Sequence, residues 1–309
     1  MRRMSVTHFK CPDGSTYPIK DCLAHCPHKR RCMARPALMA LADSIRDRGL
    51  TKFSTTELLK GTRELYLSRM YQYAIKPESL IAAFTGTGLH KINEEAVQNE
   101  SWVTVEQRLE DEITSGQIDA YGYIFSDDEL AICDYKTTSG FKVMKALGVM
   151  STDVETEQVY KTGPKRGQHK TVKKLTTDNA HLCLDWLLQQ NYYRMLLEEH
   201  GMKVDAMYIQ AYIKDSPVRL PVGYQHSQFV IKLGKISNHW LKEWFGRRKE
   251  RIEEAIRNEE LPPKCSDKDT WNGTKCERFC DVAHLCRQHE IKESFKNMFD
   301  QEEPEKSAS

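Results

Sequence analysis

The chain has 309 residues, of which 39% are apolar and 29% are charged; these values are typical of one large folded domain with small appendages. The formal net charge of +2 is too small to argue for or against a nucleic-acid partner, so local patches must decide that question. No run of about 18 apolar residues is present, and the N-terminus lacks the apolar core of a secretory signal. We therefore expect a cytoplasmic protein with no membrane partner.

The first part of the chain predicts helices after a cysteine-rich start. Residues 1–35 have little periodicity, so their cysteines supply the main constraint. A helical pattern then runs from Pro36 to a stop at Gly49. A capping box begins at Ser54 and leads into a further helical stretch, with a weak point at Gly61.

The next segment carries the first candidate ligand. Gly86 and Gly88 predict a turn, followed by a helix that carries His90. A lone histidine is most often a satisfied polar residue, but this one lies one element before an acidic hairpin, which makes it a candidate metal ligand. Residues 102–113 predict a strand, on which Glu106 could be an extra carboxylate of the site but is interpreted as a solvated charge.

Residues 115–138, SGQIDAYGYIFSDDELAICDYKTT, predict two strands joined by a tight acidic turn. If Asp127-Asp128 forms a two-residue loop, Asp119 falls opposite Lys136 and diagonal to Asp134. Two carboxylates and an ammonium would then share one patch, where carboxylate oxygens suit a hard divalent cation such as Mg²⁺. The alternative is a surface hairpin with an ordinary ion pair.

The stretch 139–180 is the least compact part of the chain and contains YKTGPKRGQHKTVKK. Its lysines and arginines could form a basic flap over nucleic acid, where they would neutralise phosphates, or a solvated linker. A strong helix follows and closes at Gly201; on it Gln189 and Tyr193 are spaced i, i+4. Tyr193 could instead be a core residue and Gln189 a surface one. Strands over 203–213 and 227–234 and an amphipathic helix over 239–257 complete the pattern.

Eight of the cysteines form two sets with the same spacing, C-x10-C-x3-C-x5-C. The N-terminal cysteine set is Cys11, Cys22, Cys26 and Cys32, and the C-terminal cysteine set is Cys265, Cys276, Cys280 and Cys286. Four thiolates are the usual complement of a tetrahedral zinc ion or an iron–sulfur cluster, and the spacing does not choose between them. We expect both sets to bind metal and Cys133 and Cys183 to be ordinary buried thiols.

The order His90, Gly116-x-x-Asp119, Asp134-Tyr-Lys136, Gln189-x-x-x-Tyr193 resembles the PD-(D/E)XK nuclease superfamily. It is most similar to the RecB-like exonuclease branch with a cysteine staple, and the resemblance covers about residues 80–290. Each motif is weak alone, whereas their order and spacing together are fairly specific.

The resemblance implies a role for each matching residue. His90, Asp119 and Asp134 would ligate the catalytic Mg²⁺ or Mn²⁺, assisted by the backbone carbonyl of Tyr135, and Lys136 would orient or help deprotonate the attacking water. Two further catalytic residues would position the substrate or the lysine: Gln189 and Tyr193.

The family's staple is a [4Fe–4S] cluster, and Cys276, Cys280 and Cys286 match its last three cysteines. The family takes one upstream cysteine as the fourth ligand, whereas this chain has four upstream and Cys265 nearby. Two separate four-thiolate sites are therefore the expected partition, with zinc as the alternative metal. A cluster shared between both ends is the other possibility.

The expected fold is α/β, with a mixed central sheet flanked by helices, a restriction-endonuclease-like core, and cysteine-rich metal clasps at both ends. The expected domains are a metal-binding segment over 1–35, the nuclease core over 36–264 with its insertion at 139–180, a clasp over 265–290, and a partly disordered tail over 291–309.

The function implied is a metal-dependent DNA nuclease, an exonuclease acting on DNA ends or single strands, which could work with a separate helicase or recombination protein. The alternatives are a non-cleaving DNA-binding or assembly subunit and a metal- or redox-sensing protein.

Overall fold

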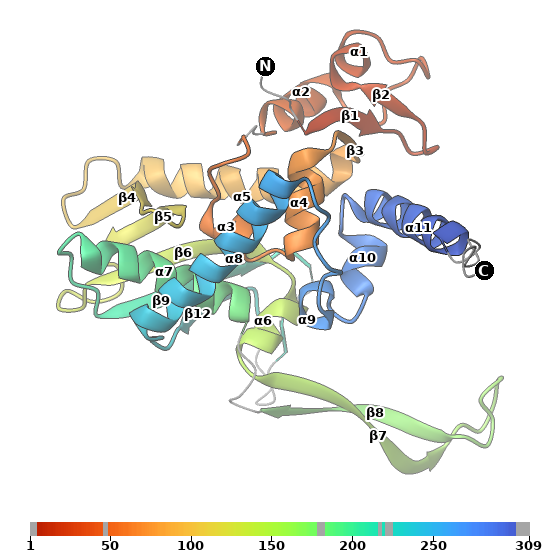
Figure 1. Ribbon diagram of the computed structural model, residues 1–309. Helices are drawn as coiled ribbons and strands as arrows, with labels where there is room; N and C mark the ends of the chain where they lie inside the picture. Colours follow the sequence, from red (N-terminus) through yellow and green to blue (C-terminus); the bar gives the residue numbers. More distant parts are fainter. Residues whose placement is uncertain (1–4, 46–48, 178–182, 216–217, 220–224, 301–309) are drawn as a thin grey trace, which may run out of the picture. The chain divides into compact units, whose positions relative to one another are not determined.

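The computed structural model describes residues 5–45, 49–177, 183–215, 218–219 and 225–300. The chain divides into two compact units: unit 1 comprises the described parts of Met1–Phe84, Glu110–Ser115 and Lys242–Ser309, and unit 2 those of Thr85–Leu109 and Gly116–Leu241. The fold is a mixed α/β fold, as expected from the sequence (Figure 1). No helix of the described residues is long and apolar enough to cross a lipid bilayer.

Unit 2 is built on a mixed sheet. Within the described residues its strand order is β12-β9-β6-β5-β4, in which β6 runs parallel to β9 and antiparallel to β5. The strands are β4 (Val103–Glu110), β5 (Ser115–Gly122), β6 (Ala131–Thr138), β9 (Ala206–Ile213) and β12 (Gln228–Lys232). Ala131, Ile132 and Cys133 are all buried, as expected for a central strand covered on both faces.

Helix α7 (Leu184–Glu199) packs on strands β6 and β9. Its residues from Trp186 to Leu197 are all buried, so it is a core helix rather than a one-sided amphipathic one. Its buried Asn191 is hydrogen-bonded: Nδ2 donates to the carbonyls of Leu187 and Gly234, both at 2.9 Å. These bonds fix the rotation of α7 over the sheet.

The structure changes three sequence expectations about unit 2. The turn expected at Gly86 and Gly88 is wrong: helix α5 (Pro77–Ala96) runs through both glycines, because glycine costs only about 1 kcal/mol relative to alanine in a helix and this helix is 20 residues long. The insertion, expected as a basic flap or a solvated linker, has regular structure: helix α6 (Gly140–Ala146) leads into a long antiparallel hairpin of β7 (Val149–Val159) and β8 (His169–Thr177) (Figure 1). Residues 178–180 of the insertion lie outside the described residues.

The third correction concerns the acidic hairpin. Its connection spans residues 123–130 rather than two residues, and the register pairs Ala120 with Cys133 and Gly122 with Ala131. The same register, continued by one residue, sets Asp119 across from Asp134 and not from Lys136. The register differs because the two ends of the connection form hydrogen bonds outside the hairpin: the Tyr123 N–H donates to the Trp102 carbonyl, and the Leu130 N–H donates to Asp205 Oδ2.

Unit 1 gathers segments that are far apart in the sequence. Its elements are β1 (Val6–Lys10), β2 (Thr16–Pro18), α1 (Ile19–Ala24), α2 (Arg35–Asp43), α3 (Thr55–Leu58), α4 (Thr62–Met70), β3 (Tyr73–Ile75), α8 (Asn238–Asn258), α9 (Asp267–Thr270), α10 (Thr274–Arg278) and α11 (Ala283–Asp300). The break between α3 and α4 confirms the weak point expected at Gly61. Helix α11 extends through much of the tail that the sequence predicted as partly disordered, and residues 301–309 lie outside the described residues. The short strands β10 (Val218–Arg219) and β11 (Gln225–His226) belong to unit 2.

Candidate functional site

Asp134 and Lys136 form the centre of the candidate site on β6. Lys136 Nζ lies 2.6 Å from Asp134 Oδ2, and the Asp134 side chain is 3% exposed against 24% for Lys136. The other oxygen, Oδ1, accepts a hydrogen bond of 3.3 Å from Gln189 Nε2. Gln189 Nε2 also lies 3.1 Å from the Tyr193 hydroxyl. The four predicted catalytic side chains of β6 and α7 therefore form one hydrogen-bonded group.

A glycine makes room for this group. A Cβ atom built on Gly116 would lie 2.1 Å from Cε1 of Tyr193, closer than real side chains approach. The Tyr193 ring thus packs directly against the backbone at the start of β5. Burial, followed by the charge of Asp134, raises the pKa of Tyr193 to about 12, so its hydroxyl, which accepts the hydrogen bond from Gln189 Nε2, stays protonated.

Asp119 joins the site from β5. Its Oδ2 accepts a 2.8 Å hydrogen bond from the Tyr135 N–H, and its Oδ1 lies 3.5 Å from His90 Nδ1. His90 Nε2 lies 2.8 Å from the Tyr135 carbonyl oxygen. Two of the three expected ligands, His90 and Asp119, are thus adjacent, with the Tyr135 carbonyl directly against the imidazole, while Asp134 is bonded to Lys136 and Gln189 on the next strand.

Glu106 is a further member of the site, which the sequence led us to interpret as a solvated charge. Ligand atoms of His90, Glu106 and Asp119 all lie within 4.8 Å of one another. Glu106 is half-buried, and its carboxylate accepts a hydrogen bond from Gln117 Nε2. Its φ of 52° is a left-handed conformation in the middle of a strand, which re-aims the side chain as β-bulges do. No residue pattern signals this conformation, because a non-glycine residue with positive φ looks ordinary in a sequence.

The electrostatics of the site favour a bound cation. Burial, and then the charge of Asp134, raise the pKa of Asp119 well above its usual 3.8. Burial alone would lower the pKa of Lys136, but Asp134 and Asp119 outweigh it and raise that pKa. A carboxylate that is costly to ionise, placed beside an imidazole and a second carboxylate, gains from a divalent ion. This oxygen-rich donor set with one nitrogen fits Mg²⁺ or Mn²⁺.

The C-terminal cysteine set lies in unit 1, around α4, α10 and α11. Cys276 is on α10 and Cys286 on α11, with Cys265 before α9. A Cβ built on Gly61 would lie 2.4 Å from Cys265 Sγ, so this thiol occupies the space where a side chain at position 61 would be. The Arg63 guanidinium donates to Cys286 Sγ at 3.7 Å. Burial, and then Glu64, raise the pKa of Cys280 to about 11.

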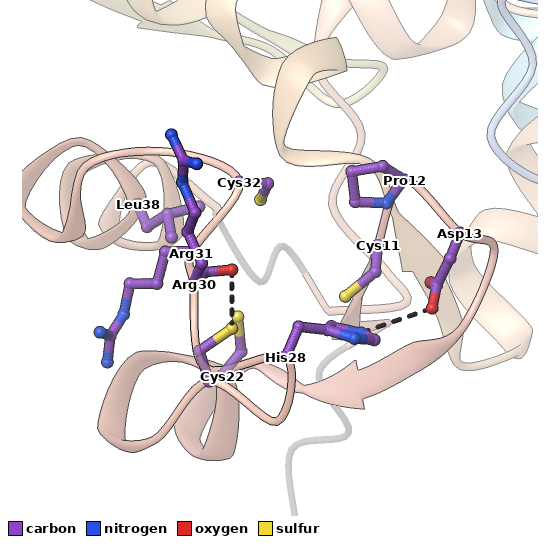
Figure 2. A pocket seen from close by; sticks show the side chains of 10 residues that line it. Cys11, Pro12, Asp13, Cys22, His28, Arg30, Arg31, Cys32 and Leu38 are labelled. Atoms are coloured by element: carbon purple, nitrogen blue, oxygen red, sulfur yellow. Dashed lines mark hydrogen bonds and ion pairs between the residues drawn. The ribbon is translucent and has the colours of Figure 1, made fainter.

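The N-terminal cysteine set lines a pocket. The pocket has a volume of about 430 Å³, and all four thiols of the set contribute to its wall (Figure 2). Cys133 and Cys183 are buried single thiols, as expected.

Comparison with known proteins gives little further information. No family model and no curated protein matches the chain. Among solved structures, "Crystal structure of SSO0001" is similar with a TM-score of 0.39 and 11% sequence identity, covering 81% of this chain and 93% of that one.

Proposed function

We propose that the protein is a Mg²⁺- or Mn²⁺-dependent DNA nuclease with a PD-(D/E)XK active site in a restriction-endonuclease-like core. The observation that supports it most is the convergence of His90, Asp119, Asp134 and Lys136, from three elements of unit 2, on one patch. A buried, mutually repelling pair of carboxylates destabilises a fold, so its presence is easiest to explain by chemistry that requires it.

The residues of the site divide the work of hydrolysis. When bound by His90, Glu106, Asp119 and Asp134, the divalent ion supplies an activated water and offsets charge on the phosphodiester. Lys136, which is the most exposed member of its ion pair, orients the attacking water and stabilises the charge that develops on the phosphate. Gln189 holds the orientation of Asp134 through its amide.

Two further features fit a DNA substrate and a RecB-like enzyme. Lys161, Lys165 and Arg166 are exposed where β7 and β8 meet, and such cations neutralise phosphates. The C-terminal cysteine set is proposed to hold a [4Fe–4S] cluster, with zinc as the alternative metal. Since Cys265 fills the space beside Gly61, it is the fourth ligand in this proposal.

The alternatives have less support. A DNA-binding subunit without catalysis gains nothing from two adjacent buried carboxylates. A redox sensor needs thiols of low pKa at accessible positions. Burial instead raises the pKa of several thiols in the two sets: Cys11, Cys22, Cys265 and Cys280.

The test is cleavage of end-labelled linear DNA by wild-type protein and by Asp134→Asn, with Mg²⁺ or Mn²⁺ added. The variant keeps the size of the side chain but removes its charge, and we expect the rate to fall by at least about 100-fold. Asp127→Asn, on the exposed connection between β5 and β6, is the matched control and should cleave at the wild-type rate. Wild-type cleavage by Asp134→Asn would refute the active site. Closed circular DNA in the same assay distinguishes an exonuclease, which spares it, from an endonuclease.

A further inference from the structure

The N-terminal cysteine set lies on turns that bring its thiols to one hollow. Cys11 directly follows β1, and its carbonyl accepts from the Gly14 N–H, which closes a turn in which Gly14 has a φ of 90°. Cys22 lies on α1, and Cys26 and Cys32 lie between α1 and α2. Figure 2 shows the labelled thiols of Cys11, Cys22 and Cys32 around the hollow.

The surrounding residues support a bound metal at this hollow. Asp13 Oδ1 accepts from the Ser15 hydroxyl, which keeps Ser15 beside the Cys11 thiol. Arg31 Nη2 donates to the carbonyls of Leu23 and Ala24, both at 3.3 Å, and so fixes the end of α1 against the loop that carries Cys32.

The apolar core under the pocket is too small to explain this arrangement. Its buried members are Phe9, Cys22, Leu38 and Ile75, surrounded by partly buried side chains. The strands and helices here are short: β2 has three residues and α1 has six. Segments with so little buried surface are usually fixed by a disulfide or a metal, and all four cysteines are free.

We propose that Cys11, Cys22, Cys26 and Cys32 hold a structural zinc ion that is independent of both the catalytic metal and the C-terminal cysteine set. The Cys22-x3-Cys26 step has the ligand spacing of structural zinc sites. Ligand atoms of His28 and Asp13 lie within 4.8 Å of Cys11 Sγ, and zinc tolerates such mixed surroundings. His28 Nε2 is 3.5 Å from Asp13 Oδ2, and in this proposal the pair lies next to the four thiolate ligands without binding the zinc.

The experiment is zinc and iron analysis of the full-length protein, purified without oxygen, for wild type, Cys26→Ser, His28→Gln and Cys183→Ser. We expect Cys26→Ser to lose one zinc per chain and to keep all its iron. His28→Gln and Cys183→Ser, a matched buried thiol of unit 2, should keep the wild-type zinc content. The proposal would be overturned if Cys26→Ser kept the wild-type zinc content or if it lost iron. The all-thiolate ligand set would be overturned if His28→Gln lost as much zinc as Cys26→Ser.

A second measurement, on the wild-type protein, tests the proposal even if Cys26→Ser fails to fold. Wild-type protein reconstituted with Co²⁺ in place of zinc should show the visible absorption of a tetrahedral thiolate site, and the absence of these bands would count against the proposal. Neither readout depends on DNA cleavage, so the zinc site and the proposed nuclease can fail separately.

Discussion

Two carboxylates on neighbouring strands, Asp119 and Asp134, repel each other unless a proton or a cation lies with them. Because the folded-state pKa of Asp119 is raised, its protonated form stabilises the metal-free fold. That contribution is complete below the unfolded-state pKa near 3.8 and is lost as the pH rises through the folded-state value. The metal-free protein is therefore less stable at neutral pH than it would be without this carboxyl group.

Asp119→Asn should consequently raise the melting temperature of the metal-free protein at pH 7.5, and this gain should shrink toward zero near pH 4. Addition of Mn²⁺ should reverse the order, since at 100 times the Kd a ligand stabilises by about 2.7 kcal/mol, and the variant loses a ligand. Thermal melts in chelator and in Mn²⁺, with Asp127→Asn as the control, measure both effects. A variant that melts below wild type in chelator at pH 7.5 would contradict this account.

For individual residues, the sequence predicted which side chains form the candidate site better than it predicted how they are arranged. The order of His90, Asp119, Asp134, Lys136 and Gln189 along the chain was enough to identify side chains that do come together. The pairing of Asp119 with Asp134 was not predictable, because the register depends on where the connecting loop bonds. Glu106 was considered as an extra carboxylate but interpreted as a solvated charge, because its left-handed backbone is a property of the folded strand.

The β7–β8 hairpin is the largest element whose form the sequence did not predict. Its pairing includes one acid–base pair, Asp153 opposite Lys173, but the other charged residues of the two strands are interspersed with threonines, and in a sequence this polar mixture resembles a linker. The turn at the tip closes the hairpin: the Tyr160 N–H donates a hydrogen bond to the Gln168 carbonyl, and Gly163 and Gly167 have positive φ angles. The long strands and helices with clear periodicity, such as β4 and α8, were predictable because burial of one face dominates their formation.

Simultaneous replacement of Lys161, Lys165 and Arg166 by alanine should weaken DNA binding without altering metal binding. If all three contact phosphates, the slope of log K against log salt should become shallower by roughly 2 to 3, at about 0.9 per contact for duplex DNA. Fluorescence anisotropy with labelled DNA across a salt series measures this slope. The control is Lys91→Ala, an exposed lysine of α5 that pairs with Glu95. An unchanged slope in the triple variant would exclude the hairpin as a DNA contact.

For the whole molecule, the division into units separates two kinds of chemistry. Every member of the candidate catalytic site lies in unit 2, and both cysteine sets lie in unit 1. In the sequence, the only sign of this division is that cysteines occur at both ends. The packing of residues 242–309 with residues 5–84 depends on long-range contacts, such as the hydrogen bond from Arg63 to the Pro262 carbonyl, which the sequence does not reveal.

Cys280→Ser should therefore remove the metal of the C-terminal cysteine set and lower the stability of the protein while leaving Mn²⁺ binding intact. Metal analysis and Mn²⁺ titration of the full chain measure the two properties together. Cys183→Ser, whose thiol donates to the Lys142 carbonyl, is the control and should keep the metal of both cysteine sets. Unchanged metal content in Cys280→Ser would refute the C-terminal site, and lost Mn²⁺ binding would refute the independence of the two centres.

The discontinuity of unit 1 also sets an order of events during synthesis. Both segments of unit 2, Thr85–Leu109 and Gly116–Leu241, leave the ribosome before the last segment of unit 1, so the sheet that carries Asp119 and Asp134 can form while α9 to α11 are still being translated. The side chain of Arg63 on α4 is 7% exposed and lies beside Glu290 of α11. More than half of the chain is translated between these two residues, so Arg63 lacks this partner during that time. Nascent chains would thus carry the sheet of the candidate site before the thiols of the C-terminal cysteine set exist, and the surface of α4 that later packs on α11 is uncovered by that helix in the interval.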